Sequence, residues 1–118
     1  MSVQKGDVAL ARVPHIAGAR GKKRPAVVIQ SNAYNATLRH IVVAEVTSNP
    51  RWNSDPACVF IDVTTPDGQA SGLQRNGVVS CLHLVTMSAD RLSAPVGRLS
   101  PSLLQGVNDA LKVALELP

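Results

Sequence analysis

The sequence predicts a mainly β domain that ends in one helix, and two patterns support this prediction. From residue 6 to residue 99, short apolar runs alternate with segments rich in Gly, Pro, Asn and Asp, as they do in folds made of many short strands. After residue 100, apolar residues recur at intervals of three and four, which indicates a helix with one buried face. We therefore expect a small, strongly bent antiparallel sheet or barrel with the helix packed against it.

Six strands are expected, and residues that favour turns separate them. Loops are expected at 14–23 and 47–56, and a turn region at 65–72. Ser31 is placed to cap a single helical turn that runs through Asn35. The second strand is almost wholly apolar, and the basic sequence Gly-Lys-Lys-Arg-Pro stands directly before it. The expected strands are 6–13, 26–30, 40–46, 58–63, 77–85 and 94–99.

The final helix has a clear beginning and one apolar face. Ser100 is a natural N-cap, and Pro101 suits the first helical position because no N–H partner is needed there. The apolar stripe that should face the sheet consists of Leu104, Val107, Leu111 and Leu115.

The composition favours a single domain, covering 1–118, with an uneven charge. Hydrophobic residues make up 45% of the 118 residues, which is enough for a core without metals or disulfides. Residues 1–59 hold eight Lys and Arg against three Asp and Glu, a net charge of +5. Residues 60–118 hold four against five, a net charge of −1. The basic half indicates an anionic partner such as nucleic acid or an acidic peptide, while 3% aromatic residues argue against an aromatic stacking platform.

The sequence gives no sign of a membrane segment, a cleaved leader or a disulfide. No apolar run approaches the roughly 20 residues that cross a bilayer, and the first residues lack an apolar stretch followed by a cleavage site. We expect a cytoplasmic protein in which Cys58 and Cys81 are buried free thiols.

Two positions at strand ends stand out as candidates for a site. Arg24 stands where the basic loop enters the second strand, and its planar set of donors suits phosphate. Thr47, Ser48 and Asn49 stand where the third strand ends, and their hydroxyls and the turn's N–H groups also suit phosphate oxygens. Each position alone is equally typical of a surface residue or a turn. Phosphate-binding Gly-rich loops, a Gly-x-Ser-x-Gly elbow and metal-ligand spacing of histidines are absent, so no metal or cofactor is expected.

Six segments, spread in order over nearly the whole chain, form a specific series. They are KGDVALA, GKKRPAVVIQSNAYN, IVVAEVTSNP, SGLQRNGVVS, MSADRL and PVGRLSPSLLQGVNDALKVAL. With this series the chain resembles the MazF/PemK (Kid) toxins of bacterial type II toxin–antitoxin systems. One segment alone would occur by chance, whereas the set in this order and spacing is specific.

The resemblance implies a fold, an activity and two partners. The fold is the small SH3-like β-barrel with a C-terminal helix found in CcdB- and PemK-type plasmid maintenance toxins, usually as a homodimer. The activity is that of a metal-independent endoribonuclease, an mRNA interferase, which cuts single-stranded RNA at short sequences and so arrests growth. Attack by the 2′-OH leaves a 2′,3′-cyclic phosphate and a 5′-OH. A MazE-like antitoxin would inhibit the toxin by laying an acidic segment across its RNA groove.

The resemblance also implies roles for individual residues. Arg24 matches the family's catalytic Arg, which would stabilise the negative charge that develops on the phosphate. Thr47 matches the family's catalytic Thr and would hydrogen-bond to the scissile phosphate. The indole of Trp52 would stack on a base or pack against a dimer partner. The residues expected to hold the RNA are Arg20, Lys22, Lys23, Ser48, Asn49, Arg51 and Trp52.

The chain departs from the family pattern in three places, which leaves the general base unassigned. Ala19 stands near a position where many members have a glutamate, and residues 82–86 (LHLVT) lack the acid and the Arg of the PemK branch. Glu45 stands where a proline is common, and it shares a strand face with Thr47. Glu45 and His83 are the candidate bases, since an ordinary imidazole is half-charged near pH 6.5. A purely structural or solvated role stays open for both.

Two other functions also stay open. One is a non-enzymatic inhibitor of DNA gyrase, as in CcdB-type toxins of similar fold, although such an inhibitor has no need of Arg24 and Thr47. The other is a degenerate family member that binds RNA or an antitoxin without cutting, which the changes near Ala19 and at 82–86 favour.

Overall fold

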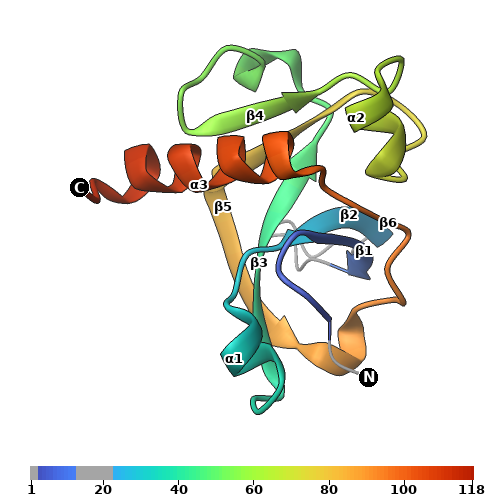
Figure 1. Ribbon diagram of the computed structural model, residues 1–118, viewed down its shortest axis with the longest axis vertical. Coiled ribbons are helices and arrows are strands. Elements are labelled where there is room, and N and C mark those ends of the chain that lie inside the picture. Colours follow the sequence, from blue (N-terminus) through green and yellow to red (C-terminus); the bar gives the residue numbers. More distant parts are fainter. Residues whose placement is uncertain (1–2, 13–22) are drawn as a thin grey trace.

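One curled antiparallel sheet and a C-terminal helix form the fold of this computed structural model, which describes residues 3–12 and 23–118 (Figure 1). The sheet has six strands in the order β4-β5-β3-β2-β1-β6, and all paired neighbours are antiparallel. The predicted class, mainly β with a C-terminal helix, is confirmed, and the sheet curls into a half-barrel. The strands are β1 (Asp7–Arg12), β2 (Lys23–Val28), β3 (His40–Thr47), β4 (Cys58–Ile61), β5 (Gly77–Ser88) and β6 (Gly97–Arg98). The helices are α1 (Asn32–Asn35), η1 (Pro50–Trp52), α2 (Pro66–Ala70), η2 (Ala89–Arg91) and α3 (Pro101–Leu115).

Buried side chains form two clusters on opposite faces of the sheet. Neighbouring residues of a strand point to opposite faces, so Val27 belongs to one cluster and Val28 to the other. α3 packs on the first cluster, and its Val107 is fully buried there. The second cluster lies on the opposite face and includes Ile41, near the beginning of β3, and Met87, near the end of β5. The residues that the sequence marks as a site stand elsewhere, at the end of β3 and the beginning of β2.

The beginning of α3 agrees with the prediction, but its end does not. Ser100 caps the helix, since its Oγ accepts a hydrogen bond from the N–H of Leu103 at 3.2 Å, and Pro101 is the first helical residue. The predicted stripe is wrong at Leu115, which is 52% exposed. The reason is that the last part of α3 extends beyond the sheet (Figure 1).

Strand boundaries differ from the prediction where pairing with a distant segment decides them. β2 begins at Lys23 rather than at 26, because Lys23 and Arg24 pair with Arg12 and Ala11 of β1. β5 continues beyond 85 to Ser88, where it pairs with the beginning of β3. β4 ends two residues early, at 61, and β6 has only two residues.

The predicted turn region at 65–72 contains a short helix. Thr65 caps α2, with its Oγ1 accepting a hydrogen bond from the N–H of Gly68 at 3.0 Å, and Pro66 follows as the first helical residue. The predicted helical turn after Ser31 is confirmed as α1, with Ser31 as its N-cap.

The two cysteines are free, but they differ in burial. Cys81 is buried as predicted, whereas Cys58 is only half-buried. Across the described ranges, we find no helix with the length and apolar character needed to cross a membrane.

Candidate active site

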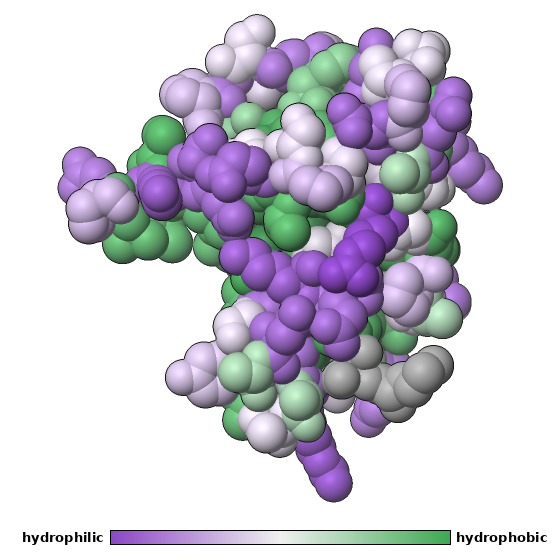
Figure 2. Space-filling model, viewed as in Figure 1, coloured by the Kyte–Doolittle hydropathy of each residue, from purple (hydrophilic) through white to green (hydrophobic). Residues whose placement is uncertain are grey.

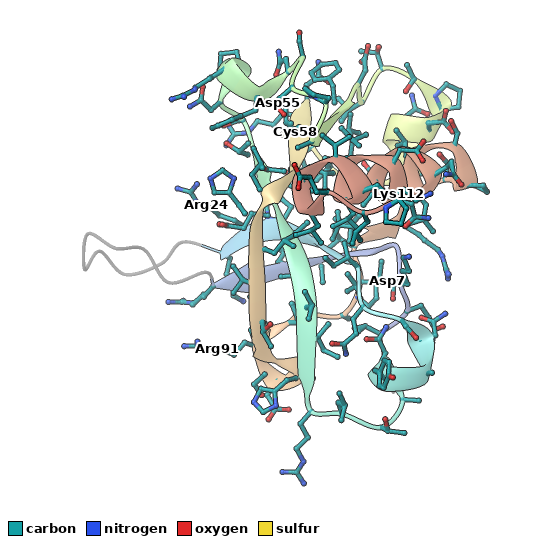
Figure 3. The ribbon with its side chains drawn as sticks, turned by 90° about the vertical axis from the view of Figure 1, so that its left-hand side faces the viewer. Asp7, Arg24, Asp55, Cys58, Arg91 and Lys112 are labelled. Atoms are coloured by element: carbon teal, nitrogen blue, oxygen red, sulfur yellow. The ribbon has the colours of Figure 1, made fainter. Side chains whose placement is uncertain are left out.

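Strand pairing brings the sequence-predicted side chains to one face of the sheet. Ala26 of β2 pairs with Glu45 of β3, so Arg24 projects to the same face as Glu45 and Thr47. Glu45 in turn pairs with Ser80 of β5. Figure 3 shows Arg24 on the side of β3 and β5 that faces away from α3. The site therefore lies on the part of the sheet that α3 leaves uncovered.

An open groove of about 720 Å³ lies along the end of β3 and the beginning of β2. Its cations come from Lys23, Arg24 and Arg75, and its hydroxyls from Thr47 and Ser48. Among the described residues that line it, none is Asp or Glu. Apolar lining comes from Leu10, Pro25, Val46, Leu73 and Val96. A groove whose described lining carries three cations and no acid suits an extended anionic ligand.

The segment 72–77 forms one wall of this groove, and a glycine allows it to do so. Gly72 has a φ of +74°, and a Cβ there would collide with the carbonyl oxygen of Val96. Only glycine combines this backbone conformation with so close an approach. The turn at Gly72 therefore places Gln74 and Arg75 at the groove.

Arg24 is fixed in its backbone and free in its side chain. Its strand pairing with Ala11 fixes the main chain. The guanidinium is exposed and makes no hydrogen bond or ion pair with any other residue that the structure describes. An ordered position and unused donors are what binding of a phosphate requires.

Thr47 sits in a small turn that leaves its hydroxyl proton available. Its Oγ1 accepts a hydrogen bond from the N–H of Asn49 at 3.1 Å, and a hydroxyl that accepts one bond still has its own proton to donate. The Oδ1 of Asn49 accepts from the N–H of Arg51 at 3.0 Å and so caps η1. Ser48 lies between them and is exposed.

An irregularity in β5 builds a second group of side chains, which does not line the groove but lies on the sheet face of Glu45 and Thr47. Ala44 pairs with Leu84 and Glu45 with Ser80, so residues 81–83 form a bulge without partners in β3. The bulge brings the His83 ring back to Ser80, with Nδ1 at 2.7 Å from Oγ. Bulges next to active sites commonly aim a side chain in this way.

Trp52 packs within the chain and contacts His83. The two rings meet edge to face, with centroids 5.8 Å apart and planes at 75°. The Arg51 guanidinium lies over the indole, with its Cζ at 4.8 Å from the ring centroid. The indole therefore has neighbours of its own, besides any base or dimer partner it would contact.

Some of the predicted residues lie outside the described part of the chain, and the groove contains one cation that the sequence patterns did not single out. Arg20, Lys22 and Ala19 fall within residues 13–22, outside the described ranges. The additional cation is Arg75. The sequence could have indicated it, because it is a basic residue just before a strand, which is the signal that marked Arg24.

Within the described ranges, no group of three or more His, Cys, Asp or Glu is placed to hold a metal ion.

The fold and the groove together define a small curled-sheet domain with an open cationic groove at its strand ends. Comparison with known proteins identifies the family. Residues 4–115 match the family described as PemK-like, MazF-like toxin of type II toxin–antitoxin system, and the chain belongs to this family.

Relatives in sequence and in structure agree with this family. Endoribonuclease MazF2 of Mycobacterium bovis and endoribonuclease MazF6 of Mycobacterium tuberculosis are each 36% identical over 97 residues, 81% of this chain and 81% of theirs. A mycobacterial endoribonuclease solved in complex with its cognate antitoxin has a similar fold, with a TM-score of 0.80 at 23% identity. That match covers 99% of this chain and 98% of the other.

Proposed function

We propose that this chain is the toxin of a type II toxin–antitoxin pair and that it cuts single-stranded RNA, chiefly mRNA, without a metal ion. The observation that supports this most is the groove. Arg24 and Thr47 lie in it at neighbouring strand ends, and its lining, over the residues that the structure describes, holds Lys23 and Arg75 as further cations and no acid. Membership of the toxin family, and relatives named as endoribonucleases, support the same activity.

The reaction needs little chemistry from the protein, because the RNA supplies its own nucleophile. The 2′-oxygen forms a bond to the neighbouring phosphorus while the bond from phosphorus to the 5′-oxygen breaks. The 2′-OH loses a proton to a base, and the 5′-oxygen gains one. The products are a 2′,3′-cyclic phosphate and a 5′-OH. What remains for the protein is to orient the phosphate, stabilise added negative charge and move protons.

Arg24 and Thr47 are the residues we assign to the phosphate. The Arg24 guanidinium, with its donors unused, would hold the negative charge that grows on the phosphate oxygens. The Thr47 hydroxyl, oriented by the N–H of Asn49, would donate to one of those oxygens. Both groups act by position and charge, so their loss should lower the rate without unfolding the protein.

We assign the other cations of the groove, and the further polar and basic residues that the sequence predicts, to the RNA backbone. Each cation that neutralises a phosphate releases counterions, so binding should weaken as salt is added. The assigned residues are Arg20, Lys22, Lys23, Ser48, Asn49, Arg51 and Arg75.

The same groove would receive the antitoxin. The family is one of toxins that pair with antitoxins, and a cationic groove is complementary to an acidic peptide segment. We place both proteins in the cytoplasm and assign this chain to a homodimer. Figure 2 shows apolar surface at the C-terminal end of α3, where Val113, Leu115 and Leu117 are each more than 50% exposed. Such apolar exposure supports contact with another protein surface.

The test uses purified wild type and Arg24→Ala with a long single-stranded RNA and excess EDTA, and maps new 5′ ends. We expect wild type to cut at one short sequence and Arg24→Ala to cut at least ~100-fold more slowly, as removal of one such donor usually does. Circular dichroism must show that Arg24→Ala is folded. Absence of cutting by folded wild type would refute the proposal, and a gyrase assay would then separate an inhibitor from a protein that only binds RNA.

A further inference from the structure

We propose that His83 is the general base that takes the proton from the 2′-OH, and that Ser80 and Trp52 are the residues that position its ring. This inference rests on the proposed ribonuclease function and assigns the step which that function leaves open.

The backbone of β5 is built so as to place this ring. Residues 81–83 leave the pairing with β3, and pairing resumes at Leu84. Without the bulge, alternation along the strand would send residue 83 to the opposite face from Ser80. With it, the imidazole of His83 reaches Ser80 on the sheet face that carries Glu45 and Thr47, and Nδ1 lies 2.7 Å from Oγ.

Two contacts hold the ring from different sides. Ser80 is fully buried, so its hydroxyl is a fixed partner rather than a mobile one. Trp52 meets the ring edge to face from η1, on a separate segment of the chain. Because Nδ1 faces a buried oxygen while the side chain as a whole is exposed, Nε2 is the nitrogen left for a substrate.

The hydrogen bonds around Ser80 allow Nε2 to accept a proton without rearrangement. Its Oγ accepts the N–H of Leu82 at 3.3 Å and lies 3.7 Å from Sγ of Cys58. A hydroxyl has one proton and two acceptor positions, and a thiol can act weakly as donor or acceptor. When Nδ1–H donates to Oγ, the Cys58 thiol changes from donor to acceptor, the hydroxyl proton turns toward its Sγ, and the Nε2 lone pair is free. Protonation of Nε2 then leaves every one of these bonds in place.

The register of the strands places this ring beside the phosphate site. Thr47 pairs with Val78, and the next same-face pair along β3 and β5 is Glu45 with Ser80. Diagonal neighbours of this kind, here Thr47 and Ser80, lie roughly 7–8 Å apart, with their Cβ atoms somewhat closer. An imidazole standing over Ser80 can partly span this gap. The 2′-OH of a nucleotide whose phosphate is bound by Thr47 and Arg24 would lie within this gap.

The elements next to the ring each carry a charged or titratable group. Glu45 comes from β3, Arg24 from β2, and Cys58 from β4. Arg51, from η1, lies over the Trp52 indole, which in turn contacts the His83 ring. Glu45 makes no hydrogen bond or ion pair within the described ranges. It is therefore the competing base, but it lacks the fixed orientation that His83 has.

The proton balance is complete without another reagent. The 2′-OH proton moves to Nε2 as the bond between the 2′-oxygen and phosphorus forms. The resulting imidazolium can then give that proton to the departing 5′-oxygen directly or through water. The ring returns to its starting form after each cut.

The test compares kcat/KM for RNA cleavage across about pH 5–8, the range in which imidazoles usually change charge. We expect wild type to show a fall in kcat/KM at acid pH, and His83→Gln to lose both that fall and roughly 100- to 10,000-fold in rate. Free imidazole should restore part of the rate to His83→Ala. Trp52→Phe should retain the acid limb at a lower rate, and Ser80→Ala should move that limb. His40→Gln, at the far end of β3, is the matched control and should equal wild type.

Three other results are possible, and each of them overturns either the ribonuclease function or the assignment of His83 as base. Failure of folded wild type to cut would overturn the ribonuclease function itself. Cutting by wild type with an unchanged rate and pH profile in His83→Gln would overturn the base assignment and leave the function intact. If Glu45→Gln loses the acid limb while His83→Gln keeps it, the base is the carboxylate, and the assignment to His83 is likewise overturned.

Discussion

Replacing Thr47 by valine removes one hydroxyl while preserving the branched shape that suits a strand. In the structure this hydroxyl accepts the N–H of Asn49 at 3.1 Å and is half-exposed. The freed N–H can turn to water, so removal of this bond should cost about 0.5–1 kcal/mol of stability. For a domain of this size, that lowers the melting temperature by roughly 2–6 °C.

The effect of Thr47→Val on catalysis should be larger than its effect on stability. A hydrogen bond to a charged group contributes about 1.5–3 kcal/mol, so loss of the bond to the phosphate should lower kcat/KM roughly 10- to 150-fold. The assay is cleavage of a short fluorescent RNA, at a temperature well below both melting points. Thr47→Ser keeps the hydroxyl and should retain most of the rate. Full activity in Thr47→Val together with a loss in Thr47→Ser would show that the methyl group, not the hydroxyl, matters, and would refute the assignment.

Two further predictions concern the groove and the core. Changing both Lys23 and Arg75 to Ala should flatten the plot of log binding constant against log salt by about 1.4, which is about 0.7 for each phosphate of single-stranded RNA that the protein no longer neutralises. Arg91→Ala in η2 is the control, and an unchanged slope in the double variant would remove both cations from the RNA path. Burial, and secondarily the nearby Cys58, raises the pKa of the Cys81 thiol from 9.0 to about 11. Between these values the unfolded chain releases the thiol proton and the folded chain keeps it, so denaturant stability should fall as pH rises from 9.0 to about 11. Cys81→Ala should abolish that part of the pH dependence, and a variant with the same slope as wild type would contradict the argument.

The local signals in the sequence are sufficient for elements whose ends are set by neighbouring residues. Ser100 and Pro101 mark the beginning of α3 because capping is a local interaction. A similar signal at Thr65 and Pro66 marks α2, although the Asp and Gly that follow it are equally typical of a turn. The exposure of Leu115 could not be predicted from the helix alone. It depends on how far the sheet extends beneath α3, and the strands of the sheet decide that.

Pairing between distant segments decides what the sequence could not show. β2 begins at Lys23 only because β1 offers partners there, and neither a basic residue nor Pro25 predicts a strand by itself. The resemblance pointed to Arg24 and Thr47, but the pairing of β2 with β3 is what gives them one face. Arg75 stands just before a strand, as Arg24 was expected to, but it reaches the groove because of the turn at Gly72, which is a tertiary effect.

The arrangement of the groove separates two tasks that the reaction sets. Binding a phosphate and stabilising its charge need donors at fixed positions, and the paired ends of β2 and β3 supply these through Arg24 and Thr47. Moving a proton needs a group whose charge can change, and a strand in regular register would bury or misdirect such a group. The bulge at 81–83 solves this by leaving the register for three residues, so that His83 stands over Ser80 on the sheet face of Glu45 and Thr47. Because residues 82–86 contain neither the acid nor the Arg of the PemK branch, His83 is the one titratable side chain left in that stretch. Its loss should therefore remove the acid limb of the pH profile, while loss of Arg24 should lower the rate equally at every pH.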